Sequence, residues 1–191
     1  MGKIILASSS PRRTDILKSL ELDFEAIPSS YVEPHEKTVF SYEFIESLAY
    51  NKALYVARDC NNKGKDSLVI GADTVVVLDN RILGKPYDKI NAVSMLKELS
   101  GKTHRVVTSV AIVNSKNLKY KIKSVTTQVV FNNLSDDMIE SYVENFKPFD
   151  KAGAYGIQEM PDGYIKKIEG SFDNVVGLPS VVVLELLRAF E

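Results

Sequence analysis

The order of apolar and polar positions predicts long strands mixed with amphipathic helices. Two stretches rich in Val, Thr and Ile, Arg105–Val113 and Lys119–Phe131, are typical of long strands because β-branched residues favour extended backbone. The apolar run Leu68–Asp73 predicts a buried strand that Thr74–Leu78 continues, and the turn pair at 79–80 follows it. Shorter strands are expected over the run from Lys3, Asp23–Pro28, Arg81–Lys85, Gly153–Ile157 and Tyr164–Ile168.

Helical periodicity is clearest from Ser41 to about Arg58. Its apolar stripe recurs at steps of three and four residues. Lys52 falls on that stripe, where it either snorkels at the edge of the core or points into a cleft, and spacing alone favours snorkelling. Further helices are expected from Pro11, from Asp88 to about Leu99, from Ser135 to about Glu144, and after Pro179.

This irregular mixture predicts an α/β fold, or an α+β mixed sheet, with helices packed on it. No repeat, low-complexity tract or long linker interrupts the chain of 191 residues, so we expect one domain over residues 1–191.

Composition narrows the function class. The formal net charge of −1 gives no general attraction to nucleic acid or to an anionic membrane, so any phosphate affinity requires local clustering. Cys60 is the only cysteine, which excludes an internal disulfide, and a free structural or partly exposed thiol is expected. We see no signal peptide and no apolar run near 18 residues, which predicts a cytoplasmic protein without membrane partners.

The segment that precedes the first helix has the features of an anion site. Ser10 is suited to the N-cap position, where its hydroxyl would accept from a free amide, and Pro11 suits the first helical position. Arg12 and Arg13 add planar donor forks beside the positive end of the helix dipole. The alternative is an ordinary capped surface helix with solvated arginines.

Two phosphate-binding motifs can be rejected. The tripeptide Gly101–Thr103 would need a glycine at position 96 to form a P-loop, and Leu96 stands there. The dinucleotide motif G-x-G-x-x-G does not occur in the chain.

Asp73 is the main candidate for chemistry. We expect it to end an apolar strand, where side chains commonly enter a cleft, and a carboxylate there must be solvated, paired or metal-bound. It could orient or deprotonate a water, or hold Mg²⁺. Glu33 is a possible second carboxylate and Lys85 a possible phosphate contact. Taken singly, each is more often structural or solvated than catalytic.

Several blocks occur in an order that resembles the Maf family. They run from about residue 3 to residue 188, and together they are far more specific than any one motif. The blocks are LASSSPRR (6–13), GADT (71–74), GKP (84–86), LSGKTH (99–104), DKAGAYGIQ (150–158) and VGLP (176–179).

The resemblance implies an ITPase-like fold with two lobes that flank a central cleft, commonly in a homodimer. It implies a nucleoside triphosphate substrate, cleaved to the monophosphate and pyrophosphate with a divalent metal, Mg²⁺ or Mn²⁺. Arg12, Thr74 and Gln158 resemble the branch of the family that prefers dTTP, UTP and modified pyrimidine nucleotides.

The resemblance also implies a role for each matched residue. Asp73 would be the catalytic base, and Glu33 would join it in metal and water positioning. Arg12, Thr74 and Gln158 would tune base selectivity. The triphosphate would be held by Ser8, Ser10, Arg13, Lys52 and Lys85.

Two other function classes are considered. One is a non-catalytic nucleotide-binding regulator of septum formation and cell-division arrest, which the family resemblance suggests. The other is an RNA-binding module, which the net charge and the lack of interleaved basic and aromatic residues make improbable. Among these classes the enzyme is favoured.

Overall fold

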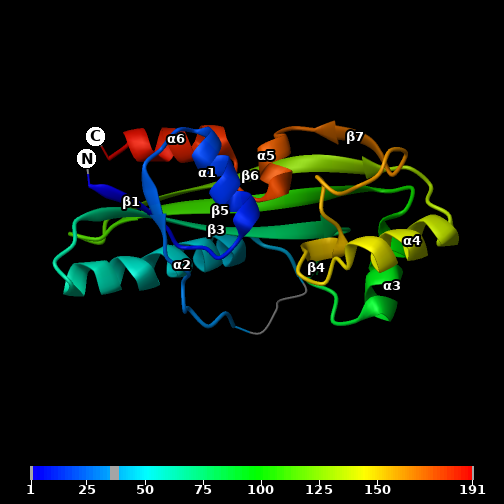
Figure 1. Ribbon diagram of the computed structural model, residues 1–191, viewed down its shortest axis with the longest axis horizontal. Helices are drawn as coiled ribbons and strands as arrows, with labels where there is room; N and C mark the ends of the chain where they lie inside the picture. Colours follow the sequence, from blue (N-terminus) through cyan, green and yellow to red (C-terminus); the bar gives the residue numbers. More distant parts are fainter. Residues whose placement is uncertain (1, 35–38, 191) are drawn as a thin grey trace.

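The computed structural model describes residues 2–34 and 39–190 and consists of one mixed sheet with helices on both faces (Figure 1). The sheet order is β2-β1-β3-β5-β6-β7, and β4 pairs with the end of β3. The strands are β1 (Lys3–Leu6), β2 (Phe24–Ala26), β3 (Ser67–Leu78), β4 (Arg81–Leu83), β5 (Thr103–Asn114), β6 (Tyr120–Phe131) and β7 (Ile165–Glu169).

The helices surround this sheet at its two ends. They are α1 (Pro11–Ser19), α2 (Tyr42–Asn62), α3 (Lys89–Leu99), α4 (Asp136–Phe146), α5 (Phe172–Val176), α6 (Ser180–Arg188) and a short 3₁₀ turn, η1 (Ala152–Ala154). None of them, within the described ranges, is both long and apolar enough to cross a membrane. The mixed α/β architecture expected from the sequence is confirmed.

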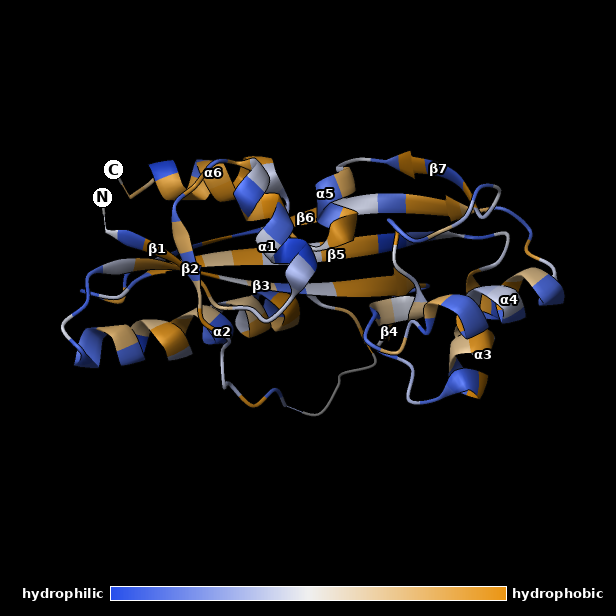
Figure 2. Ribbon diagram, viewed as in Figure 1, coloured by the Kyte–Doolittle hydropathy of each residue, from blue (hydrophilic) through white to orange (hydrophobic). Residues whose placement is uncertain are grey.

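Three strands of 12 residues each, β3, β5 and β6, run through the whole molecule and join two lobes. Helices α1, α2 and α6 lie with β1 at one end, and α3, α4 and η1 lie with β4 at the other (Figure 1). Figure 2 shows that β3 and β5 are hydrophobic along much of their length, whereas the outer faces of the helices are hydrophilic. The expected two-lobed organisation therefore rests on one continuous sheet.

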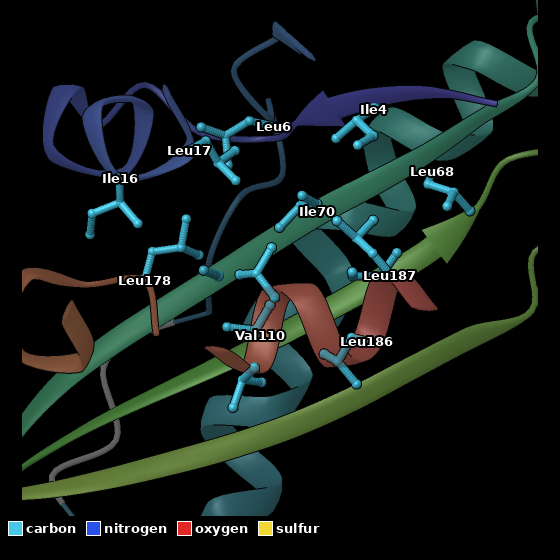
Figure 3. Packing of buried hydrophobic residues seen from close by; sticks show 14 of the residues in the cluster. Ile4, Leu6, Ile16, Leu17, Leu68, Ile70, Val110, Leu178, Leu186 and Leu187 are labelled. Carbon is cyan, nitrogen blue, oxygen red and sulfur yellow. The ribbon is translucent and has the colours of Figure 1, made fainter. Parts of the chain in front are cut away.

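Side chains of β3 alternate between two different cores, as strand geometry requires. Its even-numbered residues Leu68, Ile70 and Ala72 pack with α1 and α6, where Leu17, Leu186 and their neighbours are buried (Figure 3). The odd-numbered Val69 packs with α2 on the opposite face. Further along, the even-numbered Val76 and Leu78 join the core beneath α3 and α4.

A gap in strand pairing separates the two lobes along one edge of β3. Strand β1 pairs in parallel with residues 67–70, and β4 pairs antiparallel with residues 76–78. No described strand pairs with residues 71–75 on that edge, while β5 pairs with them on the other. The free edge forms the floor of a cleft between the lobes.

Helix α2 approaches β3 most closely at Gly71. A Cβ built at Gly71 would lie 2.3 Å from the Ala49 carbonyl oxygen and 2.7 Å from the Ala53 amide nitrogen. Both atoms belong to the helix backbone, so only glycine permits this approach. Lys52 lies between the two alanines, and the close contact brings its side chain to the cleft.

The structure corrects several expectations. Asp73 does not end a strand: it lies in the middle of the continuous β3, because the following Val-rich residues keep the extended form. Gly153–Ile157 is not a strand, since Gly153 adopts φ 66° within η1 and the chain then turns. The sequence did not predict helix α5. Of the two alternatives for Cys60, the structure shows the structural one, because the free thiol is buried on α2.

We expect Gly71→Ala to lower the free energy of unfolding by about 3 kcal/mol, since the added methyl meets backbone that cannot move alone. Denaturant unfolding would measure the change. Gly64→Ala is the control: a Cβ there meets nothing within 4 Å, so only the positive φ of 65° opposes it, at about 1 kcal/mol. Equal losses in the two variants would contradict this account of the helix–sheet contact.

The buried His104 should make stability depend on pH. It is 2% exposed, its Nε2 lies 2.7 Å from the Tyr155 hydroxyl, and burial lowers its pKa to about 4. The unfolded chain, with an ordinary histidine pKa near 6.5, binds a proton first as pH falls, so folded-state stability is lost below that value.

We therefore expect the free energy of unfolding to fall by up to about 3 kcal/mol between pH 6.5 and pH 4 through this one group. Chemical denaturation across that range would measure it. His104→Gln, which keeps a polar group beside Tyr155 but does not titrate, should show a correspondingly flatter profile. Parallel profiles for the two proteins would rule out His104 as the source.

Candidate active site

The cleft is a cavity of about 460 Å³ between the lobes, a size usual for small-molecule sites. Five described residues that line it are cationic and three are acidic, although the whole chain carries a net charge of −1. The charged lining residues are Arg12, Arg13, Lys52, Lys85, Lys151, Glu33, Asp73 and Asp150. This local excess of positive charge suits an anionic ligand.

Lys52 and Asp73 form the most buried ion pair of the cleft. Lys52 Nζ lies 2.5 Å from Asp73 Oδ1 and 2.8 Å from Glu33 Oε1. The Lys52 and Asp73 side chains are 16% and 11% exposed, whereas that of Glu33 is half-exposed. Lys52 therefore points into the cleft and does not snorkel at the edge of the core.

The environment of Asp73 favours a proton acceptor. Burial raises the pKa of Asp73 above its ordinary value, while the positive charges of Lys52 and Arg13 oppose that rise. A raised pKa makes a carboxylate a stronger base than one in water, and the two cations keep it available in the charged form. Burial gives this residue its basicity, and its neighbours limit the protonated fraction.

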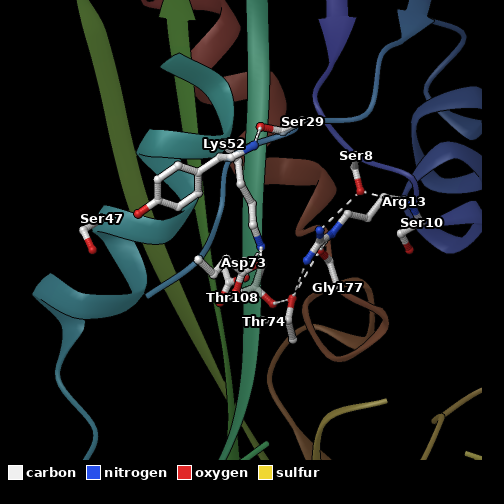
Figure 4. Close-up of polar contacts among 12 residues, drawn as sticks. Ser8, Ser10, Arg13, Ser29, Ser47, Lys52, Asp73, Thr74, Thr108 and Gly177 are labelled. Carbon is white, nitrogen blue, oxygen red and sulfur yellow. Dashed lines mark hydrogen bonds and ion pairs between the residues drawn. The ribbon is translucent and has the colours of Figure 1, made fainter. Parts of the chain in front are cut away.

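Arg13 is fixed by three hydrogen bonds at the other side of the cleft floor. Its Nε donates to the Gly177 carbonyl at 2.8 Å, Nη2 donates to Thr74 Oγ1 at 3.2 Å, and Nη1 donates to Ser8 Oγ at 3.4 Å. A guanidinium has five N–H donors, so two remain for a ligand. Figure 4 shows Arg13 reaching Thr74 and Gly177, and Lys52 reaching Asp73.

The serine loop, residues 8–10, has hydrogen bonds that differ from those predicted. Ser10 does occupy the N-cap position of α1, but its hydroxyl makes no capping bond. The nearby hydroxyl of Ser8 accepts from the Ser10 amide at 3.1 Å and so holds the loop before the helix. Both serines line the cleft, so the predicted N-cap position is confirmed and the predicted capping bond is wrong.

Adjacent residues of β3 serve opposite faces of the sheet. Asp73 shares the face of Gly71, against α2, and Thr74 shares the face of Val76, against η1. Both reach the cleft because the β3 edge between them is unpaired. Asp73, Lys52 and Glu33 therefore lie on one side of the floor, and Thr74 and Arg13 lie on the other.

A charged cluster forms the wall of the cleft on the Thr74 side. This Lys151 cluster consists of Arg12, Asp150, Lys151 and Glu159. Arg12 Nη1 lies 3.3 Å from Asp150 Oδ2, so this pair spans the two lobes. Lys151 is almost completely buried, with Nζ 2.8 Å from Asp150 and 3.2 Å from Glu159, and its stem lies against Gly156. Lys151 falls within the DKAGAYGIQ block, but nothing in the sequence distinguishes it from a surface lysine.

Two expected site residues lie further out. Lys85 is exposed at the lip of the cleft just after β4 and is among the lining residues. Gln158 lies in an exposed turn after Gly156 and is not among them. The structure thus brings together Ser8, Ser10, Arg12, Arg13, Glu33, Lys52, Asp73, Thr74 and Lys85, and leaves Gln158 outside.

The two carboxylates are arranged around a positive charge. The Lys52 ammonium lies between Glu33 and Asp73, at the place where a divalent ion would contact both oxygens. No group of three or more metal-ligating side chains occurs in the described part of the chain. Mg²⁺ usually takes one or two carboxylates together with substrate phosphates and water, so this pair fits such an ion.

Comparison with known proteins agrees with the motifs. A family model described as Maf-like protein matches residues 3–190. The chain is 47% identical to a dTTP/UTP pyrophosphatase of Acetivibrio thermocellus, over all of this chain and 96% of that protein. It is also 47% identical to proteins of the same name from Thermosipho africanus, over 97% and 92%, and Alkaliphilus oremlandii, over 98% and 96%.

Among solved structures, a nucleoside-triphosphatase named dITP/XTP pyrophosphatase from Mycobacterium abscessus is similar over 98% of this chain and 96% of its own. The TM-score is 0.47 at 16% identity, too low to support a conclusion. The family model and the curated relatives, by contrast, extend over nearly the whole sequence. The chain belongs to the Maf-like protein family.

Proposed function

We propose that the chain is a nucleoside triphosphate pyrophosphatase that hydrolyses dTTP and UTP to the monophosphate and pyrophosphate. The observation that carries this proposal is a buried carboxylate, Asp73, bonded to Lys52 in a cleft with an excess of cations. The names of three relatives at 47% identity support the reaction and the two substrates.

Asp73 acts as the general base. Its carboxylate is bonded to Lys52, and the raised pKa favours proton uptake. A triphosphate in the cleft competes for the Lys52 ammonium, which leaves the carboxylate free to accept a proton from water. The water then attacks a phosphorus atom in line with the leaving phosphate oxygen.

The cations of the cleft stabilise the charge that develops on the phosphate oxygens. Arg13 has two N–H donors free, and its position is fixed by Gly177, Thr74 and Ser8. Lys52 on the other side of the floor and the exposed Lys85 at the lip add further positive charges. Donors that are already oriented stabilise a transition state without reorganisation, so we assign Arg13 the largest share.

A divalent metal, Mg²⁺ or Mn²⁺, would be held by Asp73 and Glu33 together with phosphate oxygens. When bound, such an ion neutralises phosphate charge and makes the phosphorus easier to attack. Lys52 must then leave the position between the carboxylates, where it would repel the ion. Its long flexible stem allows this movement toward a phosphate.

Base selectivity is assigned to Arg12, Thr74 and Gln158. Arg12 and Thr74 lie on the face of the cleft floor opposite Asp73, beside the Lys151 cluster. Gln158 would have to turn inward to contact a ligand, because its side chain is exposed.

The decisive assay is pyrophosphate release from dTTP, UTP, CTP, GTP, ATP and 7-methyl-GTP with Mg²⁺ or Mn²⁺. We expect dTTP and UTP to be turned over and the others to be poor substrates. Nucleotide binding without turnover across this panel would contradict the enzyme and favour the regulator of septum formation. The homodimer, the cytoplasmic location and a role in nucleotide-pool housecleaning stay predictions.

We expect Asp73→Asn to lose turnover by about 10³-fold or more while it retains nucleotide binding, since the amide cannot accept the proton. Steady-state kinetics and calorimetric titration with UTP would measure the two effects. Asp59→Asn is a matched control, because it neutralises an exposed carboxylate of α2 that pairs with Lys63 and does not line the cleft. Near-normal turnover of Asp73→Asn would eliminate Asp73 as the base.

Glu33→Gln should raise the Mg²⁺ concentration needed for half-maximal rate by about tenfold, because one of two anionic ligands becomes neutral. Activity would be measured against Mg²⁺ concentration at saturating UTP. Saturating metal should restore much of the rate, which separates weak metal binding from a loss of the base. An unchanged metal dependence would remove Glu33 from the metal site.

A further inference from the structure

Behind Thr74 lies a buried chain of hydrogen bonds that determines where its hydroxyl proton points. Thr108, completely buried on β5, donates from Oγ1 to the Asn174 carbonyl at 2.8 Å. A carbonyl can only accept, so the single proton of Thr108 is used there. Thr74 Oγ1 lies 2.9 Å from Thr108 Oγ1, and Thr74 must therefore be the donor in that contact.

The hydrogen-bonding positions that Thr74 can still offer a ligand follow from counting its donors and acceptors in the same way. A hydroxyl has one proton and two acceptor positions. The proton goes to Thr108, because the other acceptor that the described residues offer, the Gly177 carbonyl, is more distant at 3.4 Å. One acceptor position is occupied by Arg13 Nη2 at 3.2 Å. Thr74 thus offers the cleft one acceptor position and no donor.

The chain of bonds is rigid beyond Thr108. Asn174, also fully buried, donates from Nδ2 to the Val106 carbonyl at 2.9 Å and to Thr127 Oγ1 at 3.0 Å. Thr127 in turn donates to the Ser171 carbonyl at 3.0 Å. These bonds fix the start of α5, and with it the Asn174 carbonyl that orients Thr108.

We propose that Thr108 is a positioning residue for base selection, which holds Thr74 as an acceptor for the N3–H of a uracil or thymine ring. This rests on the proposed function. The two substrates share only two donors in the nucleoside, the ring N3–H and the 3′-hydroxyl. Cytosine has an unprotonated N3, whose lone pair would face the lone pair of Thr74. A cleft group left without its partner disfavours the wrong ligand strongly.

The test uses Thr108→Val, which keeps the shape of the side chain and removes its hydroxyl. Thr74 then loses its near acceptor, so its proton can turn to a ligand. Thr108→Ser restores the hydroxyl. Ser109→Ala is the matched control, since it removes a buried hydroxyl of β5 that bonds to Ser124 and lies outside the network of Thr74 and Thr108. Thermal unfolding of each variant would confirm that it is folded.

The readout is the ratio of affinities for the α,β-imido analogues of UTP and CTP, measured by calorimetry, together with kcat/KM for UTP and CTP. We expect wild type, Thr108→Ser and Ser109→Ala to share a preference for uridine. Thr108→Val should reduce that preference by about tenfold, mainly through improved binding of the cytidine analogue.

Several results would overturn the proposal. An equal preference in Thr108→Val and wild type would show that Thr108 does not set selectivity. A wild-type protein that binds both analogues equally would show that Thr74 does not read the ring. A 3′-deoxy-UTP that loses as much affinity as CTP would assign the acceptor to the sugar. Because binding is measured separately, absence of turnover would reject the proposed function and leave this test intact.

Discussion

The close contact between α2 and β3 at Gly71 determines the geometry of the whole cleft. Without a side chain at Gly71, the helix backbone at Ala49 and Ala53 lies directly on the strand. Lys52, which lies between those alanines in α2, is then within hydrogen-bonding distance of Asp73. Asp73 lies two residues after Gly71, on the same face of β3. Burial of the Asp73 carboxylate is tolerated because this lysine is present, and its basicity is a consequence of the same burial.

The cleft also depends on the interruption in strand pairing along β3. Strand β1 ends at Leu6 and β4 begins its pairing at Val76, so an unpaired edge remains between them. Successive side chains of a strand point to opposite faces, and only at a free edge can both reach one ligand. The serine loop, Arg13 and the Lys151 cluster then supply walls around this edge. The proposed base, Asp73, and the proposed selectivity residue, Thr74, are therefore adjacent residues with different surroundings.

Much of the fold follows from local sequence signals. The N-caps at Ser41, Asp88 and Ser135 and the Val-rich strands are strong signals, and the structure confirms the helices and strands that they predict. The structure of Gly153–Ile157 was harder to predict from the sequence. Its apolar residues suit a strand, whereas Gly153 adopts a left-handed backbone conformation. That Asp73 lies at an unpaired edge of β3 depends on where the neighbouring strands end, which no local pattern encodes.

Fewer features of the candidate site than of the fold could be predicted from the sequence. The resemblance to known motifs names Asp73, Lys52 and Arg13, and spacing places Lys52 on the inner stripe of its helix without showing that it enters the cleft. Lys151 escapes detection because its importance lies in its burial, and Thr108 because its partner Asn174 is distant in the sequence. Long-range hydrogen bonds such as that of Thr108 with Asn174 become visible only in three dimensions.

The continuity of β3, β5 and β6 through both lobes has a consequence for motion. Three adjacent strands, each of 12 residues, connect the walls of the cleft, so a hinge between the lobes would have to bend all three together. Large rotations of one lobe against the other are therefore opposed by the ladder of hydrogen bonds itself. Adaptation to ligands falls instead to side chains such as Lys52 and Lys85 and to the short segment 150–159, so the cleft is in large part shaped before any ligand arrives.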